Sequence, residues 1–281
     1  MKIKEYLKDK IPQDKINYVP TSFDIIGKIC ILEIKDELKK YEKIIGDTII
    51  HLNKNIKSVF KRISPRKGKY RTYKLKLISG LNNKETVYKE NGVLFKLDVE
   101  KCYFSPRWSN ERLIISNLVK KNETILVMFS GIGSFIYVIL KKSNPKKVFS
   151  IELNKVAHKY SLENLKLNKF DENKVKLFNG DVKNILPKIK IKFDRILMPL
   201  PKESYKFLDL ALKKIKKNGI IHYYTFLEEP KEKLNSKKLE EYWKKLLKEQ
   251  LEIENLKIVK IRKSGVYAPR IYRVCVDIKA Y

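Results

Sequence analysis

Glycines and an acidic residue at the ends of two apolar segments give the strongest chemical signal in this chain. The segment TILVMF, residues 124–129, leads into Gly131 and Gly133. A second segment, KVFSIE, ends on Glu152, 21 residues after Gly131. Glycines at a strand-to-helix turn let the backbone approach a nucleotide-type ligand, and an acidic residue about 20 positions later accepts hydrogen bonds from ribose hydroxyls. This spacing, together with Phe129 before the turn, predicts a nucleoside-binding site.

The ligand predicted for this turn is S-adenosylmethionine. A dinucleotide fingerprint requires a third glycine after the first two, and the segment of this chain that contains Phe135 has none. Dinucleotides place a pyrophosphate on the helix N-terminus, whereas S-adenosylmethionine has no phosphate and needs only close backbone approach. A dinucleotide site, or a turn whose glycines serve packing alone, is the alternative interpretation.

Further candidates follow the later apolar segments. Asp181 comes after KVKLFNG and is placed to accept from an adenine amino group, to cap the next helix, or both. FDRILM is followed by Pro199, Leu200 and Pro201, where amino-methylating enzymes commonly carry an acidic or amide residue. Pro199 offers no donor, so the polar catalytic groups must come from elsewhere.

The best source of such groups is FSPRWSNER, residues 104–112. Ser105 can cap a helix and Pro106 fits its first position. Arg107 and Glu111 are then predicted to form an i,i+4 pair on one helix face. A surface ion pair without function is the simpler alternative.

From residue 123 onward, apolar segments alternate with helical patterns, as in a parallel sheet covered on both faces. Residues 204–217 show one apolar helical face that ends before Gly219, and residues 235–251 form a charged helix. The last two apolar segments, 251–263 and 270–280, have no long helix between them and are expected to pair antiparallel at the sheet edge. This α/β plan is that of a class I, Rossmann-like methyltransferase.

The first part of the chain has a different pattern. We predict a short extension over residues 1–20, a smaller α+β domain for RNA binding and catalytic support over 21–104, and the methyltransferase domain over 105–281. A helix is expected over 36–52 and a hairpin turn at Asn91-Gly92. Short strands are expected at ILEIKDEL, SVFKRIS, RTYKLKLIS, ETVYKE, GVLFKLDV and CYFS.

Charge indicates the class of partner. The 63 basic and 32 acidic residues leave +31 on 33.3 kDa, which favours a polyanion bound through phosphate neutralisation. The basic loop over residues 61–71, KRISPRKGKYR, with Tyr70 and Tyr73, suits phosphates and stacked bases. No apolar run approaches about 18 residues and the N-terminus lacks the apolar centre of a signal peptide, so we expect a cytoplasmic protein without a membrane segment.

Cysteine and histidine usage predicts neither a metal site nor a disulfide framework. The three cysteines are odd in number and the three histidines are scattered, without the spacing of metal ligands. Each cysteine stands among apolar residues and is most simply a small buried thiol.

Several stretches together resemble the archaeal and eukaryotic tRNA guanine-N1 methyltransferases that act at position 37, beside the anticodon. The resemblance begins at about Thr21 and runs to the C-terminus. Its most specific part is FSPR followed by ER. The other matching stretches, in the family's order, are SFDIIGKICILEI, KYRTYKLKLISG, MFSGIGSF, DRILMPLPKESYKFLDLAL, GIIHYYTFLEE and YAPRIYRVCVDI.

The resemblance implies roles for individual residues. Arg71 would stabilise charge on the guanine O6, Glu111 would take the N1 proton, and Arg107 would help to organise the site. Removing the N1 proton makes the lactam nitrogen a nucleophile. The S-adenosylmethionine site implied by the resemblance comprises Tyr103, Arg112, Phe129, Gly131, Gly133, Glu152, Asp181, Pro199, Leu200 and Pro201.

Two departures from the family pattern matter. Pro199 replaces the usual Asn, as in an archaeal subgroup that also methylates C7 of 4-demethylwyosine, so dual activity is implied. The residues before the matched region are too few for the separate domain with which many members touch the tRNA elbow, so a monomer reading the anticodon stem-loop is expected. The alternatives are an aminocarboxypropyl transferase acting on wyosine precursors and a non-catalytic RNA-binding protein.

Overall fold

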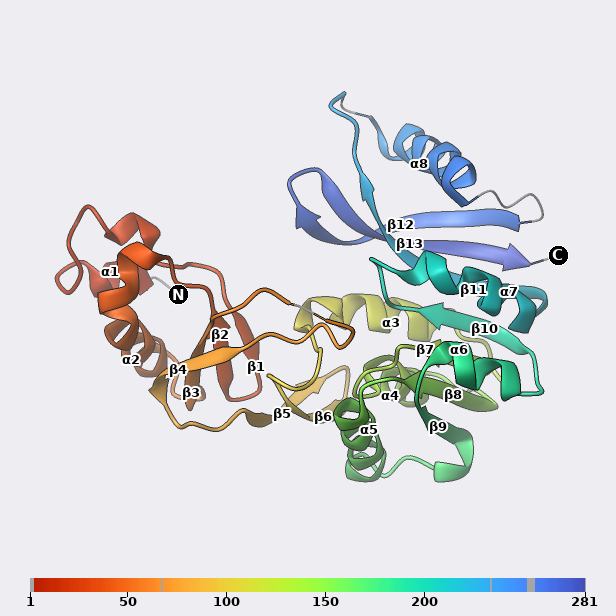
Figure 1. Cartoon of the computed structure of the whole chain (residues 1–281), viewed down its shortest axis with the longest axis horizontal. Coiled ribbons are helices and arrows are strands. Elements are labelled where there is room, and N and C mark those ends of the chain that lie inside the picture. Colours follow the sequence, from red (N-terminus) through yellow and green to blue (C-terminus); the bar gives the residue numbers. More distant parts are fainter. Residues whose placement is uncertain (1–2, 67, 233, 252–255, 281) are drawn as a thin grey trace. The chain divides into compact units, whose positions relative to one another are not determined.

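The computed structural model describes residues 3–66, 68–232, 234–251 and 256–280. The chain forms two compact units, Met1–Pro106 and Arg107–Tyr281 (Figure 1). Each unit contains its own cluster of buried apolar side chains. No helix among the described residues is both long and apolar enough to cross a membrane.

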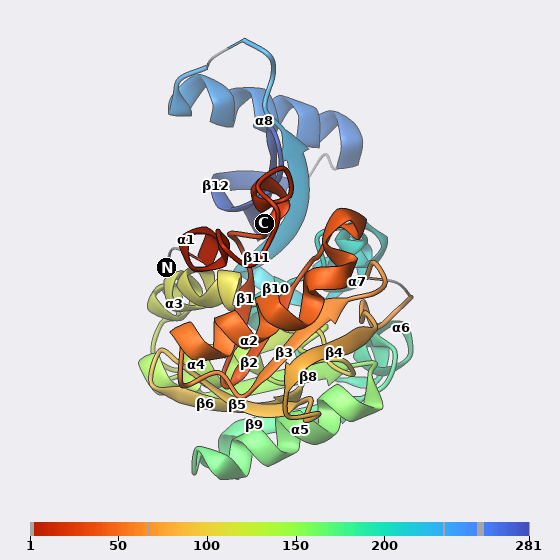
Figure 2. The ribbon, with the colours of Figure 1, turned by 90° about the vertical axis from the view of Figure 1, so that its left-hand side faces the viewer.

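The first unit is built on a four-stranded sheet in the order β1-β2-β3-β4. Its strands are β1 (Asp24–Ile26), β2 (Ile29–Leu32), β3 (Ser58–Arg62) and β4 (Leu75–Gly80), and only β2 and β3 run parallel. The helix α2 (Glu42–Leu52) follows a 3-10 turn (Asp36–Tyr41) and lies over this sheet (Figure 2). Ile3 and Leu7 of α1 (Ile3–Leu7) are buried in the same apolar cluster.

A separate hairpin joins β5 (Glu85–Glu90) to β6 (Val93–Asp98). Asn91 and Gly92 both have positive φ, 49° and 81°, as a two-residue hairpin turn requires. The predicted hairpin is therefore confirmed. The strand expected over residues 102–105 is wrong, because the Asp98 carboxylate accepts the next backbone N–H groups at 2.8 and 2.9 Å and turns the chain away.

The second unit contains a seven-stranded sheet in the order β12-β13-β11-β10-β7-β8-β9. Five strands are parallel and β13 pairs antiparallel with both β11 and β12. The strands are β7 (Thr124–Met128), β8 (Lys147–Glu152), β9 (Val175–Asn179), β10 (Phe193–Met198), β11 (Ile215–Glu228), β12 (Leu256–Ala268) and β13 (Ile271–Ala280). The predicted fold class and the terminal antiparallel pair are confirmed, while residues 252–255 of that prediction lie outside the described residues.

Helices connect these strands and cover the sheet. The helices are α3 (Ser109–Leu118), α4 (Ser134–Lys142), α5 (Lys155–Leu167), α6 (Val182–Ile185), α7 (Leu208–Lys214) and α8 (Ser236–Leu251). Leu239, Trp243 and Leu247 form the apolar face of α8 and are buried in the core shared with β12 and β13. The edge strand β12 exposes Lys257, Lys260 and Lys263, charges that disfavour pairing with a further strand.

The helix predicted over residues 204–217 is shorter in the structure. A 3-10 turn (Ser204–Phe207) precedes α7, and the chain becomes extended at Ile215, with φ −79° and ψ 144°. Ile215 is buried and pairs with Phe193 of β10, so burial in the sheet prevails over helical periodicity. Asn218 then takes φ 63° where the pairing of β10 and β11 is irregular.

Gly133 is expected to be essential for the stability of the second unit. Its φ is +86°, and an added Cβ would lie 2.2 Å from the Tyr137 ring. Gly133→Ala should therefore destabilise the protein by about 2–5 kcal/mol, from the left-handed conformation and overpacking together. Gly68→Ala is the control, because Gly68 has φ +69° but open space around it. Urea unfolding should show a clearly larger loss for Gly133→Ala, and equal losses would contradict the packing argument.

Candidate active site

The carboxyl ends of β7, β8, β9 and β10 lie along one edge of the sheet, because these strands are parallel neighbours. The residues predicted from sequence to bind the cofactor follow those ends. The structure therefore brings together Phe129, Gly131, Gly133, Glu152, Asp181, Pro199, Leu200 and Pro201 at one edge of the second unit.

Glu152 connects two of these strand ends. Its Oε2 accepts the Gly131 N–H at 2.6 Å, and its Oε1 accepts the Asn154 N–H at 2.7 Å. Burial raises the pKa of the Glu152 carboxyl, and the hydrogen bonds from Asn154 and Gly131 oppose that shift. A carboxylate offers about four acceptor positions, so two bonds leave capacity for ribose hydroxyls.

The turn between β7 and α4 has an unusual backbone. Phe129 and Gly131 have φ 55° and 57°, and Phe129 packs edge-to-face on Phe207 at 4.8 Å. The missing side chain of Gly133 makes room for Tyr137, so packing explains this glycine. The buried Oγ of Ser130 has no hydrogen-bond partner among the described residues, as expected for a hydroxyl that a ligand satisfies. The turn therefore fits a nucleoside ligand.

Asp181 caps the helix that follows β9. Its Oδ1 accepts the Lys183 N–H at 2.8 Å, which confirms the capping role. The Gly180 N–H and the Asn179 side-chain amide both donate to the Glu152 carbonyl at 2.8 Å. The ends of β8 and β9 are thereby joined, and adenine recognition by Asp181 stays a prediction.

The Pro199-Leu200-Pro201 segment is shaped by a buried hydroxyl. Ser204 Oγ lies 2.9 Å from the carbonyl oxygens of both Met198 and Leu200. The Leu200 N–H donates back to the Met198 carbonyl at 2.8 Å. The segment is therefore fixed by its own backbone and offers no side-chain donor or acceptor.

Glu111 is the buried acidic group of the site. Its side chain is 2% exposed and its Oε1 accepts the Tyr224 hydroxyl at 2.7 Å and an Arg262 N–H at 3.2 Å. Arg107 is exposed in a 3-10 turn (Pro106–Trp108) before α3. The charged partner of Glu111 is Arg262, which replaces the expected i,i+4 pair with Arg107. Arg112, on the same helix, is also buried.

Aromatic rings surround this carboxylate. Tyr224 packs against Trp108 at 5.0 Å and against Phe135 at 6.2 Å, and Trp108 meets Phe135 edge-to-face at 5.8 Å. Arg273 stacks on Trp108 at 3.7 Å. Phe135 follows the glycine turn on α4, and the structure uses its ring to build this aromatic cluster.

A chain of buried charges extends from Arg262 through the sheet. Arg262 Nη1 donates to Asp277 Oδ2 at 2.6 Å, and Asp277 Oδ1 lies 2.7 Å from His222 Nδ1. His222 Nε2 lies 2.6 Å from Arg195 Nη1, and Arg195 Nε donates to Glu123 at 2.8 Å. A guanidinium only donates, so His222 Nε2 accepts and the neutral ring carries its proton on Nδ1.

The electrostatics of this chain follow from burial and pairing. Burial raises the pKa of the Asp277 carboxyl, but His222 and Arg262 outweigh it and lower the pKa to about 2. Burial lowers the pKa of His222, although Asp277 opposes this shift. Burial also raises the pKa of the Tyr224 hydroxyl well above its usual value. At neutral pH Asp277 is ionised, while His222 and Tyr224 are uncharged.

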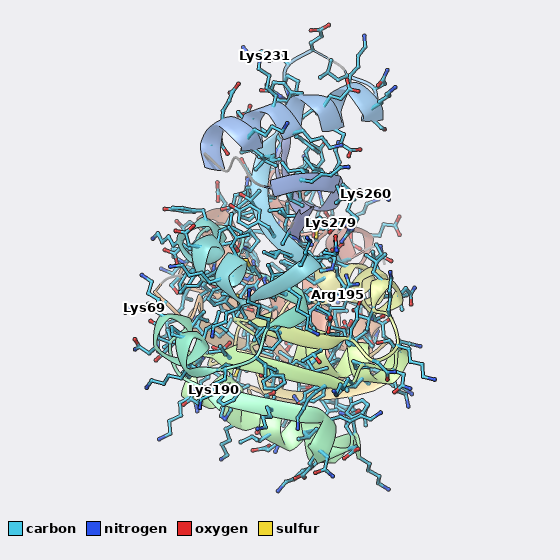
Figure 3. All side chains as sticks on the ribbon, turned by 90° about the vertical axis from the view of Figure 1, so that its right-hand side faces the viewer. Lys69, Lys190, Arg195, Lys231, Lys260 and Lys279 are labelled. Atoms are coloured by element: carbon cyan, nitrogen blue, oxygen red, sulfur yellow. The ribbon has the colours of Figure 1, made fainter. Side chains whose placement is uncertain are left out.

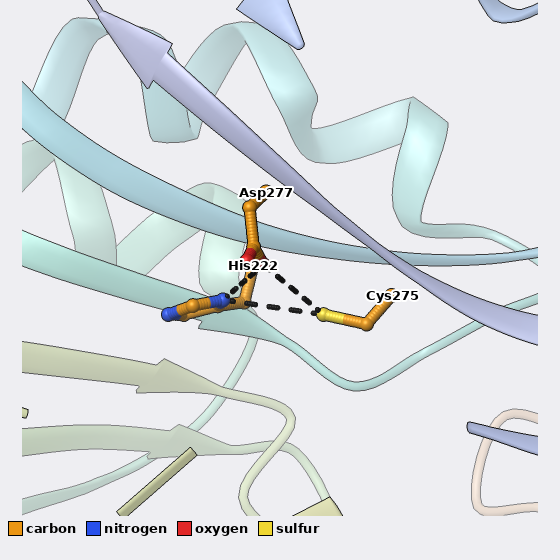
Figure 4. A group of neighbouring side chains, drawn as sticks. All are labelled: His222, Cys275 and Asp277. Atoms are coloured by element: carbon orange, nitrogen blue, oxygen red, sulfur yellow. Dashed lines mark hydrogen bonds and ion pairs between the residues drawn. The ribbon is translucent and has the colours of Figure 1, made fainter. Parts of the chain in front are cut away.

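His222, Cys275 and Asp277 converge closely enough to resemble a metal-binding triad (Figure 4). The proton on His222 Nδ1 points at Asp277, and Cys275 Sγ lies 3.1 Å from Arg262 Nη2. Burial raises the pKa of the Cys275 thiol, and two guanidiniums border the group. This arrangement is a charge-paired hydrogen-bond chain, which disfavours a cation.

The sequence analysis did not predict Tyr224 or Arg262, nor the chain of partners Asp277, His222 and Arg195. A signal was present, because Arg195 and Asp277 are charged residues inside otherwise apolar strands. Such residues need buried partners. The identity of those partners depends on pairing between strands that are distant in sequence.

The first unit carries the remaining predicted residues. Arg71 has φ 54° and its N–H donates to the Gly68 carbonyl, and Tyr103 is about one-third exposed beneath the Arg66 guanidinium at 4.4 Å. The expectation that Tyr73 stacks on a base is wrong, because its ring is buried beneath Arg62 and Arg66.

Ion pairs also occupy part of the predicted basic loop. Arg62 pairs with Asp24 at 2.6 Å and with Glu33 at 2.9 Å. Lys69 and Tyr70 are exposed, and Lys67 lies outside the described residues. In the second unit, Lys190 and Lys231 lie far apart in Figure 3, whereas Lys260 and Lys279 lie on the paired strands β12 and β13.

Two family models match the chain. The TRM5/TYW2 methyltransferase domain matches residues 86–254, and the TYW2 N-terminal domain matches residues 3–84. Among curated proteins, the tRNA (guanine(37)-N(1))-methyltransferase Trm5b of Pyrococcus abyssi is 40% identical over 96% of this chain and 78% of its own length.

Two further relatives represent other activities. The tRNA (guanine(37)-N(1))/4-demethylwyosine(37)-methyltransferase Taw22 of Nanoarchaeum equitans is 31% identical over 92% of this chain and 99% of its own length. The tRNA(Phe) (4-demethylwyosine(37)-C(7)) aminocarboxypropyltransferase of Methanocaldococcus jannaschii is 34% identical over 85% of this chain and 97% of its own length.

Solved structures show the same fold. The complex of aTrm5 and tRNALeu has a TM-score of 0.82 and 30% identity, and it covers 99% of this chain and 78% of that chain. The Trm5 of Methanocaldococcus jannaschii in complex with adenosine has a TM-score of 0.79 and 30% identity, with the same coverage.

Glu152 should make cofactor binding sensitive to mild acid. Because burial raises its pKa, the carboxylate becomes protonated at a higher pH than an ordinary Glu and loses acceptor capacity. The affinity for S-adenosylmethionine, measured by calorimetry, should fall as pH is lowered from about 7.5 to about 5. Glu152→Gln should remove this dependence, and Glu152→Ala should cost about 1.5–3 kcal/mol of binding free energy at neutral pH. Unchanged affinity in Glu152→Ala would exclude a ribose contact.

Proposed function

Because the chain belongs to the TRM5/TYW2 methyltransferase family, we propose that it methylates N1 of guanosine 37 in tRNA with S-adenosylmethionine as the donor. The observation that carries this proposal is the buried Glu111 carboxylate on α3, which Tyr224 and Arg262 hold in place. Transfer to a lactam nitrogen requires such a base, since the N1 proton must leave before the nitrogen can attack.

The cofactor-binding residues are proposed to act at the edge formed by β7 to β10. Glu152 accepts from the ribose hydroxyls, Asp181 from the adenine amino group, and the glycine turn allows close approach of the backbone. Tyr103, Arg112 and residues 199–201 are proposed to complete the cofactor site. When bound, S-adenosylmethionine supplies a methyl group on a sulfonium centre, which leaves as a neutral thioether.

Glu111 is proposed to accept the N1 proton before N1 attacks the methyl carbon of the donor. Arg71 stabilises the negative charge that deprotonation places on the guanine O6, and Arg107 helps to organise the site. Tyr224 and Arg262 fix Oε1, so the second oxygen of Glu111 is the one that receives the proton. The rest of the rate enhancement comes from positioning.

We propose that residues 21–104, which lie within the first unit, support RNA binding. The proposed partner is the anticodon stem-loop of tRNA, bound by a cytoplasmic monomer. The net charge of +31 supports a polyanionic partner. The exposed Lys69 and Tyr70 are candidates for phosphate and base contacts in this unit.

A second activity, methylation of C7 of 4-demethylwyosine, is proposed for the same site. Pro199 supports it, because a segment without a side-chain amide makes no hydrogen bond that is specific for guanine N1. A carbon nucleophile in an electron-rich ring need not lose its proton before attack. The bifunctional Taw22 is one of the relatives of this chain.

Aminocarboxypropyl transfer is the alternative function. The match of residues 3–84 to the TYW2 N-terminal domain favours it, whereas the retained Arg107 and Glu111 favour methyl transfer. Mass spectrometry of tRNA nucleosides distinguishes the two, because the transferred groups differ in mass. A non-catalytic RNA-binding protein would bind tRNA and leave both guanosine 37 and 4-demethylwyosine unmodified.

Glu111→Gln tests the base directly. The substitution keeps the shape of the side chain and removes its basicity, so single-turnover N1 methylation should fall by about 10²-fold or more while tRNA binding is nearly unchanged. Arg71→Ala should cost a similar factor through the loss of the O6 partner. C7 methylation should depend less on Glu111. N1 methylation of Glu111→Gln at the wild-type rate, with chemistry rate-limiting, would refute the base assignment.

Neutralising Arg66 and Lys69 tests the RNA contact of the first unit. The double variant Arg66→Gln/Lys69→Gln should bind tRNA more weakly and with a flatter salt dependence, because fewer counterions are released. The slope of log affinity against log salt should change by about two. Lys190→Gln/Lys231→Gln is a matched control for net charge. Equal slopes in the two double variants would make the basic loop an ordinary solvated surface.

A further inference from the structure

One guanidinium is shared by two buried carboxylates in the second unit. Arg262 lies 2.6 Å from Asp277 and 3.2 Å from Glu111, through different Nη atoms. The Asp277 contact is the closer, so the positive charge of Arg262 is directed mainly at Asp277. Glu111 receives only part of it, although both carboxylates are buried.

Asp277 competes with Glu111 for Arg262, and residues that contact its other carboxylate oxygen hold it in place. His222 donates to Asp277 through Nδ1, and Arg195 fixes the tautomer of His222. Arg195 is itself anchored by Glu123 and by the Leu118 carbonyl at 2.7 Å. Because this ladder spans three strands of the sheet, Asp277 cannot release Arg262 without breaking a buried network.

We propose that Arg262 and Asp277 are positioning residues that set the strength of Glu111 as a base, with Asp277 holding the charge of Arg262 partly away from it. The inference rests on the proposed role of Glu111 in N1 deprotonation. Full pairing with Arg262 would make Glu111 a weak base, whereas an isolated buried carboxylate would already be protonated at neutral pH. The shared guanidinium gives Glu111 a partial counter-charge, between full pairing and isolation.

The charges of the network support this role. Glu111, Asp277 and Glu123 face Arg262 and Arg195, while His222, Tyr224 and Cys275 are neutral. The network therefore carries one net negative charge, which a single proton from the substrate neutralises. It cannot carry that proton onward, because guanidiniums do not give up protons in proteins. Its effect on Glu111 is electrostatic and geometric.

The test is the pH dependence of single-turnover N1 methylation in the full-length protein, from about pH 5 to about pH 8. Arg262→Gln removes the positive charge, so Glu111 becomes protonated more readily. Its rate relative to wild type should fall by about tenfold on acidification across this range. Asp277→Asn lets Arg262 pair fully with Glu111. Its rate relative to wild type should be lower near pH 8 and should rise on acidification.

Controls separate this effect from damage to the fold. Arg262→Lys keeps the charge and should restore the wild-type pH dependence, even if the rate is lower. Lys263→Gln removes a neighbouring charge on the same strand, paired with Glu229 at 3.3 Å, and should give a ratio independent of pH. Circular dichroism spectra over the pH range establish that each variant stays folded.

The outcomes are decisive. The proposal is overturned if the rate of Arg262→Gln relative to wild type does not depend on pH. It is also overturned if the relative rates of Asp277→Asn and Arg262→Gln both fall on acidification. If Arg262→Gln does not fold, Asp277→Asn decides alone, since a ratio that falls on acidification contradicts the proposed role. N1 methylation by Glu111→Gln at the wild-type rate would instead show that Glu111 is not the base. Loss of activity in Glu111→Gln together with pH-independent ratios in the other variants would refute only this inference.

Discussion

The burial of one carboxylate constrains much of the second unit. Glu111 is almost inaccessible to solvent and lies in an aromatic cluster, so its negative charge must be compensated inside the protein. Tyr224 and Arg262 provide that compensation. Arg262 in turn requires Asp277, and Asp277 requires His222. A single desolvated carboxylate thus accounts for buried polar residues on three strands of the sheet.

The C-terminal hairpin supplies the charged partner of this carboxylate. β12 and β13 bring Arg262 and Asp277 to a residue about 150 positions earlier in the chain. In their absence, α3 would carry an uncompensated carboxylate against the sheet. The antiparallel addition to a parallel sheet therefore supplies the charged partner of Glu111 as well as part of the core.

The cofactor edge has a different physical basis. Parallel strands end together, so short segments after four of them converge with few long-range interactions of their own. Glu152 organises this edge by accepting from the backbone of the glycine turn, while its carbonyl accepts from the end of β9. Backbone geometry places these groups, whereas side-chain charge pairing places Glu111.

The sequence by itself determined the second unit's architecture, because alternating apolar segments and helical patterns admit few arrangements of a parallel sheet. It also predicted Gly131, Glu152 and Glu111 as site residues, because their spacing follows local turns and a specific motif. It did not reveal the end of α7 at Lys214, where burial of Ile215 in the sheet prevails over periodicity.

Only the tertiary structure decided which groups surround Glu111. The local pattern suggested Arg107, four residues away, but the partner is Arg262, because pairing of distant strands brings its guanidinium to the buried carboxylate. In the same way, Phe135 is part of an aromatic cluster that no spacing rule describes. Spacing along the chain determines contacts within a helix or turn, whereas contacts between strands depend on register, which the packed core alone fixes.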